Sequence, residues 1–253
     1  MIKLTKIFNL EDFTLIVPSV AVGNVAQLTV DLLVASLNLQ RIGQIITSAF
    51  IPIVGLDPYI ETSEYLSTAV DIYAGVENKI LVIQIRSPFI KSLNSFYDNL
   101  SQFITTNKIS KVVILTSSYA YEKTDTELNV TELRYIASAN ILSDNKQVFD
   151  NLKWLQYESK HISYSNNKQI TQIPGGGFAI NLFDFLTNNN IPCIILFKFC
   201  SEGDNIPDAL NLINYLNQWM NLIQINSIGS LAIKYPPSWK YLFGNKNRPI
   251  HVY

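Results

Sequence analysis

The sequence predicts an α/β fold, a single-domain α/β/α sandwich with a largely parallel central sheet and a short flexible C-terminal tail. Two observations lead to this prediction. Short runs rich in β-branched residues alternate along the 253 residues with segments of helical periodicity, which is the order that a parallel sheet requires. The strand-like runs are also apolar at consecutive positions, which is typical of strands covered on both faces. Neither an internal repeat nor a linker divides the chain.

Strand and helix signals can be followed in order along the chain. β-branched and aromatic residues fill the predicted strands, and helical periodicity marks the segments between them. The predicted strands are residues 13–18, 42–51, 79–86, 112–116 and 192–200. The predicted helices are residues 25–39, 88–106, 179–186 and 206–223, with a weaker one at 145–155. The rest of residues 119–172 has no regular pattern, and we assign no element to it.

Two of these helices carry more apolar surface than one sheet can cover. In the helix over 25–39, only Gln27, Asp31 and Asn38 form a narrow polar sector. The helix over 206–223 has a polar face of amide side chains without any charge. An ordinary surface helix has one apolar stripe and a charged or polar face opposite. Burial by other elements of the same chain explains the pattern, and so does a partner; we favour a partner for at least one of the two.

The charge balance excludes some classes of function. Lys and Arg total 19 and Asp and Glu total 20, so the basic surface that nucleic acids or anionic membranes require is not expected. Charged residues make up 15% of the chain, against roughly 25% in an average soluble domain. A partner that covers part of the surface explains this, since interface cores are poor in Lys, Glu and Asp. A coding bias toward Ile and Asn explains it equally well.

The cysteines and the hydropathy pattern bear on location. Cys193 and Cys200 lie seven residues apart in one apolar run, a spacing that fits neither a zinc nor a redox motif. Both are expected to be buried and reduced, as in the cytosol. The first residues lack the pattern of a signal peptide, and no apolar run reaches the ~18 residues of a membrane helix. We therefore expect a cytoplasmic protein with no membrane association.

The segment 201–208 joins a predicted strand to a predicted helix, where the active sites of open α/β sheets are often found. Its residues also have conformational roles. They supply a glycine that permits positive φ, an Asp or Asn that caps the helix, a proline in its first turn and an acid near its positive end. These are Gly203, Asp204 or Asn205, Pro207 and Asp208. We favour the conformational interpretation over a catalytic one.

Three consecutive glycines, Gly175, Gly176 and Gly177, precede the helix predicted over 179–186. Such a loop can form a nest of backbone N–H groups for an anion. Neither a Gly-Lys-Ser/Thr sequence nor a dinucleotide-binding spacing accompanies it, so we favour a sharp turn or a close backbone crossing. A phosphorylase-like or hydrolytic enzyme that uses this loop as an anion site is the alternative function.

Residues for catalysis or metal binding are not apparent elsewhere. His161 and His251 have no Ser or Cys nucleophile in a recognisable context. No cluster of His, Cys and carboxylate side chains has the spacing of a metal site. We therefore predict a protein that is not an enzyme, with no catalytic residue, no cofactor and no metal.

The sequence divides into a domain over residues 1–243 and a C-terminal tail over residues 244–253. Residues 245–249 are polar, and Ile250, His251, Val252 and Tyr253 follow. A polar spacer followed by apolar and aromatic residues suits insertion into a pocket of a partner. A disordered segment with incidental side chains is equally compatible with this composition.

Seven short segments stand out along the sequence. They are residues 17–28 (VPSVAVGNVAQL), 52–55 (PIVG), 84–90 (QIRSPFI), 173–177 (IPGGG), 199–209 (FCSEGDNIPDA), 237–239 (PSW) and 242–244 (LFG). Together they resemble the proteasome assembly chaperone family, whose order and spacing they match nearly from end to end. The nine residues SEGDNIPDA at 201–209 are the most specific of them.

The resemblance implies an assembly protein of the cytoplasm, and also of the nucleus, that needs neither ATP nor a metal. It implies a heterodimer with proteasome assembly chaperone 1 that binds the α-subunit ring of the 20S core particle, promotes formation of the ring and prevents off-pathway association. The family motifs would then be structural or would face a partner. Their residues are Gly23, Asn24, Gly175, Gly176, Gly177, Glu202, Gly203, Asp204, Asn205, Pro207 and Asp208.

The resemblance also suggests a role for the tail. Chaperones of this kind can carry a hydrophobic-tyrosine-any motif that enters pockets between α subunits. This sequence departs from the motif, because Tyr253 is the last residue and Val252 stands in the usual place of the tyrosine. Binding of the α ring by residues 250–253 is therefore a hypothesis.

Overall fold

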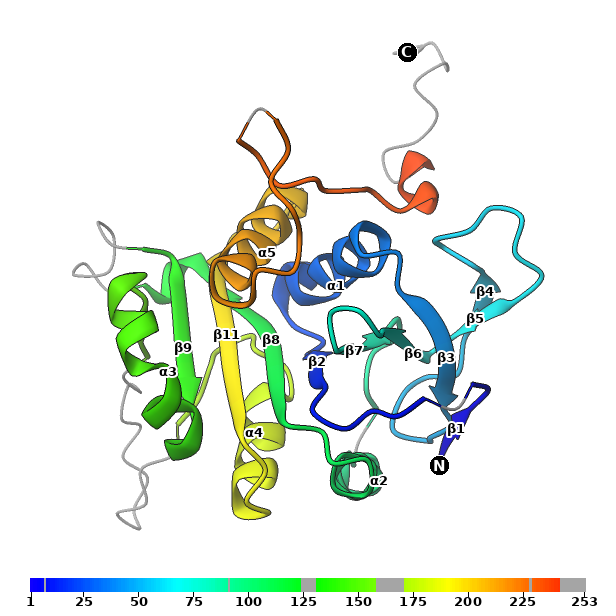
Figure 1. The fold of residues 1–253 in the computed structure, drawn as a ribbon, viewed down its shortest axis with the longest axis horizontal. Helices are drawn as coiled ribbons and strands as arrows, with labels where there is room; N and C mark the ends of the chain where they lie inside the picture. Colours follow the sequence, from blue (N-terminus) through cyan, green and yellow to red (C-terminus); the bar gives the residue numbers. More distant parts are fainter. Residues whose placement is uncertain (7, 91, 124–130, 158–170, 228, 242–253) are drawn as a thin grey trace.

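The computed structural model describes residues 1–6, 8–90, 92–123, 131–157, 171–227 and 229–241. Within these ranges, nine strands form one mixed sheet in the order β1-β3-β6-β7-β2-β8-β11-β9-β10 (Figure 1). The strands are β1 (Ile2–Leu4), β2 (Thr14–Pro18), β3 (Gln40–Ile45), β6 (Val70–Gly75), β7 (Ile80–Ile85), β8 (Lys111–Tyr119), β9 (Leu133–Ala137), β10 (Leu155–Gln156) and β11 (Cys193–Cys200). The two remaining strands, β4 (Val54–Leu56) and β5 (Leu66–Thr68), pair with each other.

The centre of the large sheet is parallel. Strands β7, β2, β8 and β11 run in the same direction, and antiparallel pairs join them to β6 and to β9. In β8, Val112 and Ile114 belong to one apolar cluster, and Val113 and Leu115 belong to the cluster on the opposite face. Consecutive apolar residues therefore serve both faces. The predicted α/β fold with a mostly parallel sheet is confirmed.

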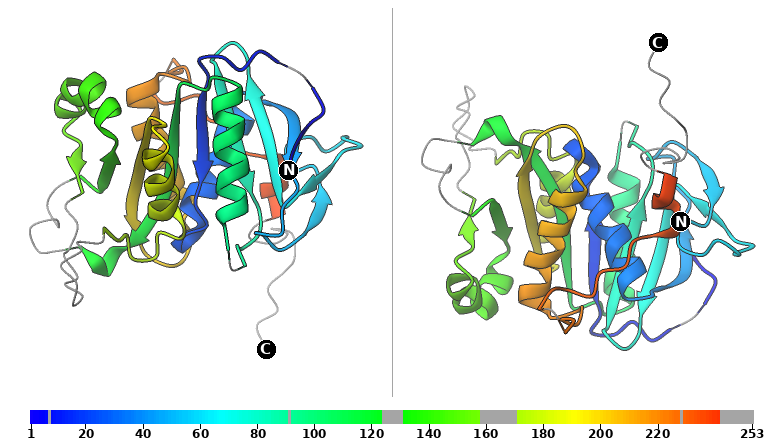
Figure 2. Two further views of the ribbon diagram at one scale, coloured as in Figure 1. Left: turned by 90° about the horizontal axis from the view of Figure 1, so that it is seen from below. Right: turned by 90° about the horizontal axis from the view of Figure 1, so that it is seen from above.

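Helices cover both faces of the sheet. The helices are α1 (Val25–Ser36), α2 (Asn94–Thr106), α3 (Ala139–Asn151), α4 (Ala179–Asn188) and α5 (Ile206–Met220). Helices α1 and α5 lie side by side on one face, with α3 toward the β9 end, whereas α2 and α4 cover the other face (Figure 2). The α/β/α sandwich expected from the sequence is thus present.

The chain after α5 closes over α1. It runs across this helix to the short helix η4 (Pro237–Tyr241), as the right view of Figure 2 shows. The backbone N–H of Lys234 donates to Ser36 Oγ at 2.9 Å. On the other side, Thr29 Oγ1 donates to the carbonyl oxygen of Ala209 in α5 at 3.3 Å. The sheet, α5 and this segment account for the apolar surface of α1, so burial by the same chain is the right explanation for that helix.

Some element boundaries differ from the prediction. The strand predicted over 42–51 ends at Ile45, because the chain then leaves the sheet and Phe50 forms a bridge with Phe89. For the same reason α2 begins at Asn94 and not at residue 88. Strands β6 and β9 were not predicted, since the charged residues Asp71 and Arg134 interrupt their apolar runs. Both of these charged residues are buried.

Candidate functional site

The ends of the parallel strands bring the family motifs together. We call this region the carboxyl edge; it comprises residues 18–24, 86–88, 116–119, 173–178 and 200–208, which follow or end β2, β7, β8 and β11 or precede α4. Ligands of open α/β sheets bind at this kind of edge, where connections leave on opposite faces. Here β2 leads to α1 on one face and β7 leads to α2 on the other.

The triple-glycine loop is held at this edge by hydrogen bonds to its backbone. Ser19 Oγ and Thr116 Oγ1 each donate to the carbonyl oxygen of Gly176 at 2.9 Å. Ser19 Oγ also accepts the N–H of Phe178 at 2.9 Å. Gly177 has φ of +62°, and a Cβ there would lie 2.1 Å from the carbonyl oxygen of Val20. The loop is therefore a close backbone crossing, as the sequence favoured, with its carbonyl groups turned toward the protein.

A second crossing joins Gly23 to the segment 201–208. Gly23 and Asn24 both have positive φ, and a Cβ on Gly23 would lie 2.7 Å from the side chain of Asn205. Asn205 is buried and donates to Asp208 Oδ2 at 3.0 Å. Asp204 Oδ1 accepts the N–H of Ile206, the first residue of α5, at 3.0 Å, whereas the side chain of the N-cap residue Asn205 makes no capping hydrogen bond.

The rest of that segment divides between solvent and the interior. Glu202, Gly203, Asp204 and Pro207 are exposed. Gly203 has φ of +136°, in the region that favours glycine, and a Cβ there would meet open space. The exposed part of the segment is therefore available to a partner, whereas Asn205 fixes the fold.

An ion cluster around the buried side chain of Lys198 ties the start of α5 to the sheet. Lys198 Nζ in β11 contacts Asp208 Oδ1 at 2.6 Å and is also paired with Glu132. Burial would lower the pKa of Lys198, but hydrogen bonds to Asp208 and Glu132 outweigh it and raise that pKa. Burial would raise the pKa of Glu132, but its contacts with Lys198 and Lys123 outweigh burial and lower that pKa. The sequence indicates this cluster only through a single lysine inside an apolar strand. A buried charge of this kind requires oppositely charged partners.

A second buried cluster centres on Asp31 of α1. Its Oδ1 accepts hydrogen bonds from Tyr59 Oη at 2.5 Å, Gln84 Nε2 at 2.6 Å and Arg86 Nη2 at 2.8 Å. Burial and the charge of Asp31 raise the pKa of the Tyr59 hydroxyl well above its ordinary value. Sequence reasoning placed Asp31 in the polar sector of its helix but did not find these partners, because they come from distant segments.

A pocket of about 390 Å³ adjoins this cluster at the carboxyl edge. Its lining includes Gln27, Arg86 and Ser87, each of which has a buried polar atom without a protein partner in the described structure. The arrangement offers donors and acceptors to a small polar group or to water, but it includes neither a thiol nor an imidazole.

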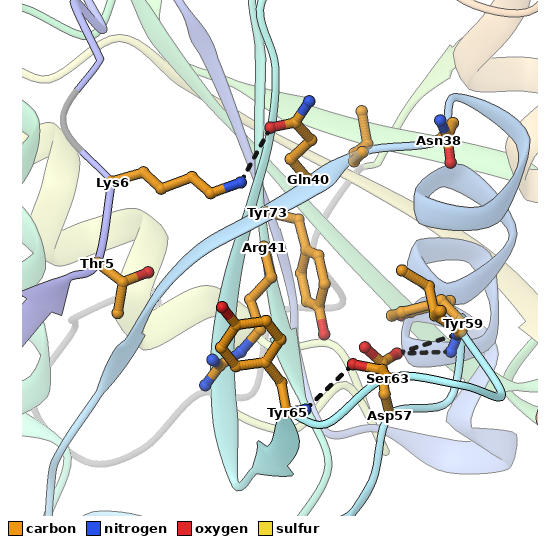
Figure 3. Close-up of a pocket in the computed structure, with 12 residues that line it drawn as sticks. Thr5, Lys6, Asn38, Gln40, Arg41, Asp57, Tyr59, Ser63, Tyr65 and Tyr73 are labelled. Atoms are coloured by element: carbon orange, nitrogen blue, oxygen red, sulfur yellow. Dashed lines mark hydrogen bonds between the residues drawn. The ribbon is translucent and has the colours of Figure 1, made fainter.

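A further pocket of about 330 Å³ lies between β3, β6 and the loop 57–65 (Figure 3). Tyr59, Tyr65 and Tyr73 contribute aromatic rings to it, and Arg41 contributes a guanidinium group. Asp57 Oδ1 is already engaged, since it accepts the N–H groups of Tyr59 and Ile60. The pocket is suited to an apolar or aromatic group.

The segment 51–68, which we call the arm, projects from this side of the molecule and contains β4 and β5 (Figure 1). All six residues from 51 to 56 are exposed. The large apolar side chains that the arm exposes are Ile51, Ile53, Val54, Leu56, Ile60, Tyr65 and Leu66. The arm includes residues 52–55, one of the segments that resembles the family.

Reactive groups are scarce in the described part of the chain. Cys193 and Cys200 are buried, and burial raises the pKa of each thiol to about 11. No group of three or more His, Cys, Asp or Glu side chains positioned to hold a metal ion occurs in the described ranges. His161, His251 and the tail residues 250–253 lie outside those ranges, as does the boundary predicted at residue 243.

None of the helices in the described ranges is both long enough and apolar enough to span a bilayer.

Comparison with known proteins gives matches along nearly the whole chain. The model of the PAC2 family matches residues 15–227. A protein of Danio rerio named proteasome assembly chaperone 2 is 39% identical over 244 residues, which cover 94% of each chain. The protein of that name from Homo sapiens is 34% identical over 247 residues, with the same coverage.

Solved structures show the same fold. PbaA of Pyrococcus furiosus, described as an archaeal homolog of proteasome-assembly chaperone, matches with a TM-score of 0.64 at 14% identity. The match covers 89% of this chain and 88% of PbaA. PbaB of the same organism, described as an archaeal proteasome activator, has a TM-score of 0.62 at 11% identity and covers 89% of this chain and 90% of PbaB. From the family-model match and the identity to these full-length relatives, the chain belongs to the PAC2 family.

Proposed function

We propose that this protein is an assembly chaperone of the proteasome core particle. The observation that carries the proposal is the identity of 39% to a proteasome assembly chaperone 2 over 94% of both chains. The match covers 94% of this chain, so nearly the whole chain is the unit of comparison. The family also suggests a role that is not enzymatic.

The chemistry of the described residues supports a binding role. At the carboxyl edge, the glycines and hydroxyl groups satisfy one another in backbone crossings. The arm, by contrast, leaves apolar side chains exposed. Contiguous exposed apolar surface in a soluble domain is typical of a contact with another macromolecule.

In the finer form of the proposal, the protein acts as a heterodimer with proteasome assembly chaperone 1. The heterodimer binds α subunits, promotes formation of their ring and prevents off-pathway association. A chaperone that binds the ring but does not bind the competing assemblies stabilises the ring by mass action, without ATP. In this scheme residues 250–253 contribute a contact to the α ring.

Co-expression tests the pairing and the client together. The full chain is expressed with proteasome assembly chaperone 1, purified through a tag on either chain, and offered purified α subunits. We expect a complex with one copy of each chaperone that retains α subunits. A monomer that binds neither the sister chain nor any α subunit would overturn the proposed function.

Deletion of residues 250–253 tests the tail within the intact heterodimer. If the tail adds a second contact to the ring, its loss lowers affinity for the α ring by about tenfold or more, because linked contacts reinforce one another. The Kd is measured by biolayer interferometry on assembled α rings, with Tyr253→Ala as a milder variant. Unchanged affinity would remove the tail from the mechanism and leave the rest of the proposal in place.

A further inference from the structure

The apolar surface of the arm is too large to be incidental. Leu56 is 82% exposed, Tyr65 71% and Val54 68%, and Ile51, Ile53, Ile60 and Leu66 are also exposed. Single exposed apolar residues are common on soluble proteins, but runs of three or four are rare unless they serve a function. Here seven large side chains lie within sixteen consecutive residues, 51–66.

The arm also has unpaired strand edges. In the described sheets, β4 has β5 as its neighbour and neither strand joins the nine-stranded sheet. An isolated two-stranded hairpin is marginally stable in water, and each free edge presents unpaired N–H and C=O groups to another strand. A strand from another chain can pair with such an edge while its side chains cover the apolar residues.

The size of the surface matches one side of a stable interface. The seven apolar side chains expose on the order of 800 Å², which is what each partner contributes to a standard protein–protein interface. Permanent interfaces are more apolar than contacts that must later be released. The apolar character of the arm therefore suits a permanently bound subunit better than a client that leaves after assembly.

The charge pattern selects among permanent partners. Residues 42–78 contain no Lys, Arg or His, whereas the arm carries Asp57, Glu61 and Glu64. Glu61 is already paired with Lys240 of η4, whose Nζ lies 2.5 Å from Glu61 Oε1. A second copy bound across a two-fold axis would place this patch against itself, and Asp57 and Glu64 would add like charge to that interface. A different chain, with Lys or Arg around an apolar surface, avoids this cost.

We propose that the arm, residues 51–68, is the surface on which the sister subunit of the heterodimer docks. The sister contributes an apolar surface with a basic rim and a strand edge that pairs with the arm. This inference rests on the proposed function, since it assigns a surface to the heterodimer proposed there.

Charged substitutions on the arm test the assignment. The full chain carrying both Val54→Asp and Leu56→Asp is titrated with the purified sister subunit, and the Kd is compared with that of the unsubstituted chain. Both side chains are exposed, so the variant is expected to fold, and circular dichroism and thermal unfolding check this. The matched control is the double variant Val148→Asp and Ile225→Asp, at apolar residues 41% and 67% exposed that lie outside the arm.

The arm variant is expected to weaken heterodimer formation by at least 100-fold, and the control variant by less than threefold. Hydrogen exchange of the unsubstituted chain gives an independent measurement, in which residues 51–68 become protected when the sister subunit is added. An arm variant that pairs normally would overturn the assignment, as would an arm that shows no added protection in the heterodimer.

Other occupants of the arm give distinct results. Protection of the arm in a homodimer would overturn the assignment, and so would protection only in complexes with α subunits. Protection in the free chain that is lost when residues 250–253 are deleted would also overturn it. Failure of the unsubstituted chain to bind the sister subunit at all would instead contradict the proposed heterodimer. The two failures are therefore distinguishable.

Discussion

The carboxyl edge and the arm use their residues in opposite ways. At the carboxyl edge, short polar side chains such as Ser19, Thr116 and Ser118 are buried and donate to backbone carbonyl groups of residues 174–176. In the arm, long apolar side chains such as Val54 and Leu56 are exposed to solvent. Both regions contain segments that resemble the family.

The difference separates residues that specify the fold from residues that are free to bind. A buried hydroxyl group with a backbone partner stabilises one arrangement of the chain, because leaving that partner unsatisfied costs free energy. An exposed apolar side chain contributes little to the stability of the isolated chain and gains most from a partner. We therefore expect substitutions at the carboxyl edge to act on stability, and substitutions of the exposed apolar residues of the arm to act on association.

Alanine at a glycine of each region is the strongest test of this contrast. Gly177→Ala places a Cβ 2.1 Å from a backbone oxygen at a φ of +62°, so we expect a loss of at least about 3 kcal/mol in the free energy of unfolding. Gly55→Ala in the arm meets nothing closer than 3.8 Å and should change it by less than about 0.5 kcal/mol. Urea denaturation of both variants measures the difference, and equal losses would contradict the contrast.

The Asp31 cluster, which lies between the two regions, should give the next largest effect. Asp31→Ala removes the acceptor shared by Tyr59, Gln84 and Arg86 and leaves a guanidinium group, 20% exposed, without its carboxylate. We expect a loss of about 3 kcal/mol in the free energy of unfolding, since breaking a buried ion pair leaves an uncompensated charge.

The matched control is an ion pair on the surface. Lys108 Nζ lies 2.9 Å from Glu11 Oε1, and both side chains are largely exposed. Glu11→Ala should cost less than about 0.5 kcal/mol, because solvent screens such pairs. If Asp31→Ala is as mild as Glu11→Ala in the same denaturation experiment, the cluster does not anchor the arm to α1.

The contrast also explains which features could be predicted from the sequence. The fold class followed from apolar runs such as residues 112–116 and 192–200, because periodicity and composition are local properties. A sharp turn or close crossing of the triple-glycine loop and a backbone hydrogen bond to Asp204 or Asn205 were also predicted. Glycine tolerates positive φ and close backbone contact, and Asp and Asn readily accept from nearby backbone N–H groups. β6 and β9 were missed because Asp71 and Arg134 break their apolar pattern.

Tertiary arrangement accounts for the rest. The partners of Asp71 and Asp31, which include Arg41 and Arg86, lie far away in the sequence and become neighbours only in the sheet. The strand predicted over 42–51 was too long, because the chain leaves the sheet after Ile45. The exposure of residues 51–56 depends on this departure from the sheet, which the apolar pattern does not encode.

Of the three substitutions that test the contrast, Tyr59→Phe should cause the smallest loss of stability, and it removes a single hydroxyl group. Tyr59 lies in the arm, and its hydroxyl donates to Asp31 at 2.5 Å and accepts from Arg86 Nη2 at 3.0 Å. Removing this hydroxyl should cost about 1 kcal/mol of stability near neutral pH. It should also speed hydrogen exchange in residues 51–68 more than at the carboxyl edge, because the arm loses its contact with α1.

The pH dependence distinguishes this contact from general packing. Burial and the charge of Asp31 raise the pKa of Tyr59 above 10, so the folded protein keeps this proton where the unfolded chain releases it. The stability that Tyr59 contributes is thus complete below pH 10 and is lost as the pH rises above 10. Tyr97, whose pKa is also raised by burial, belongs to the apolar cluster on the opposite face of the sheet and is present in both proteins, so its titration cancels in the comparison. The stability difference between the parent chain and Tyr59→Phe should therefore shrink from pH 8 to pH 11 in urea denaturation. A constant difference would show that Tyr59 ionises alike in the folded and unfolded chains, which contradicts its burial against Asp31.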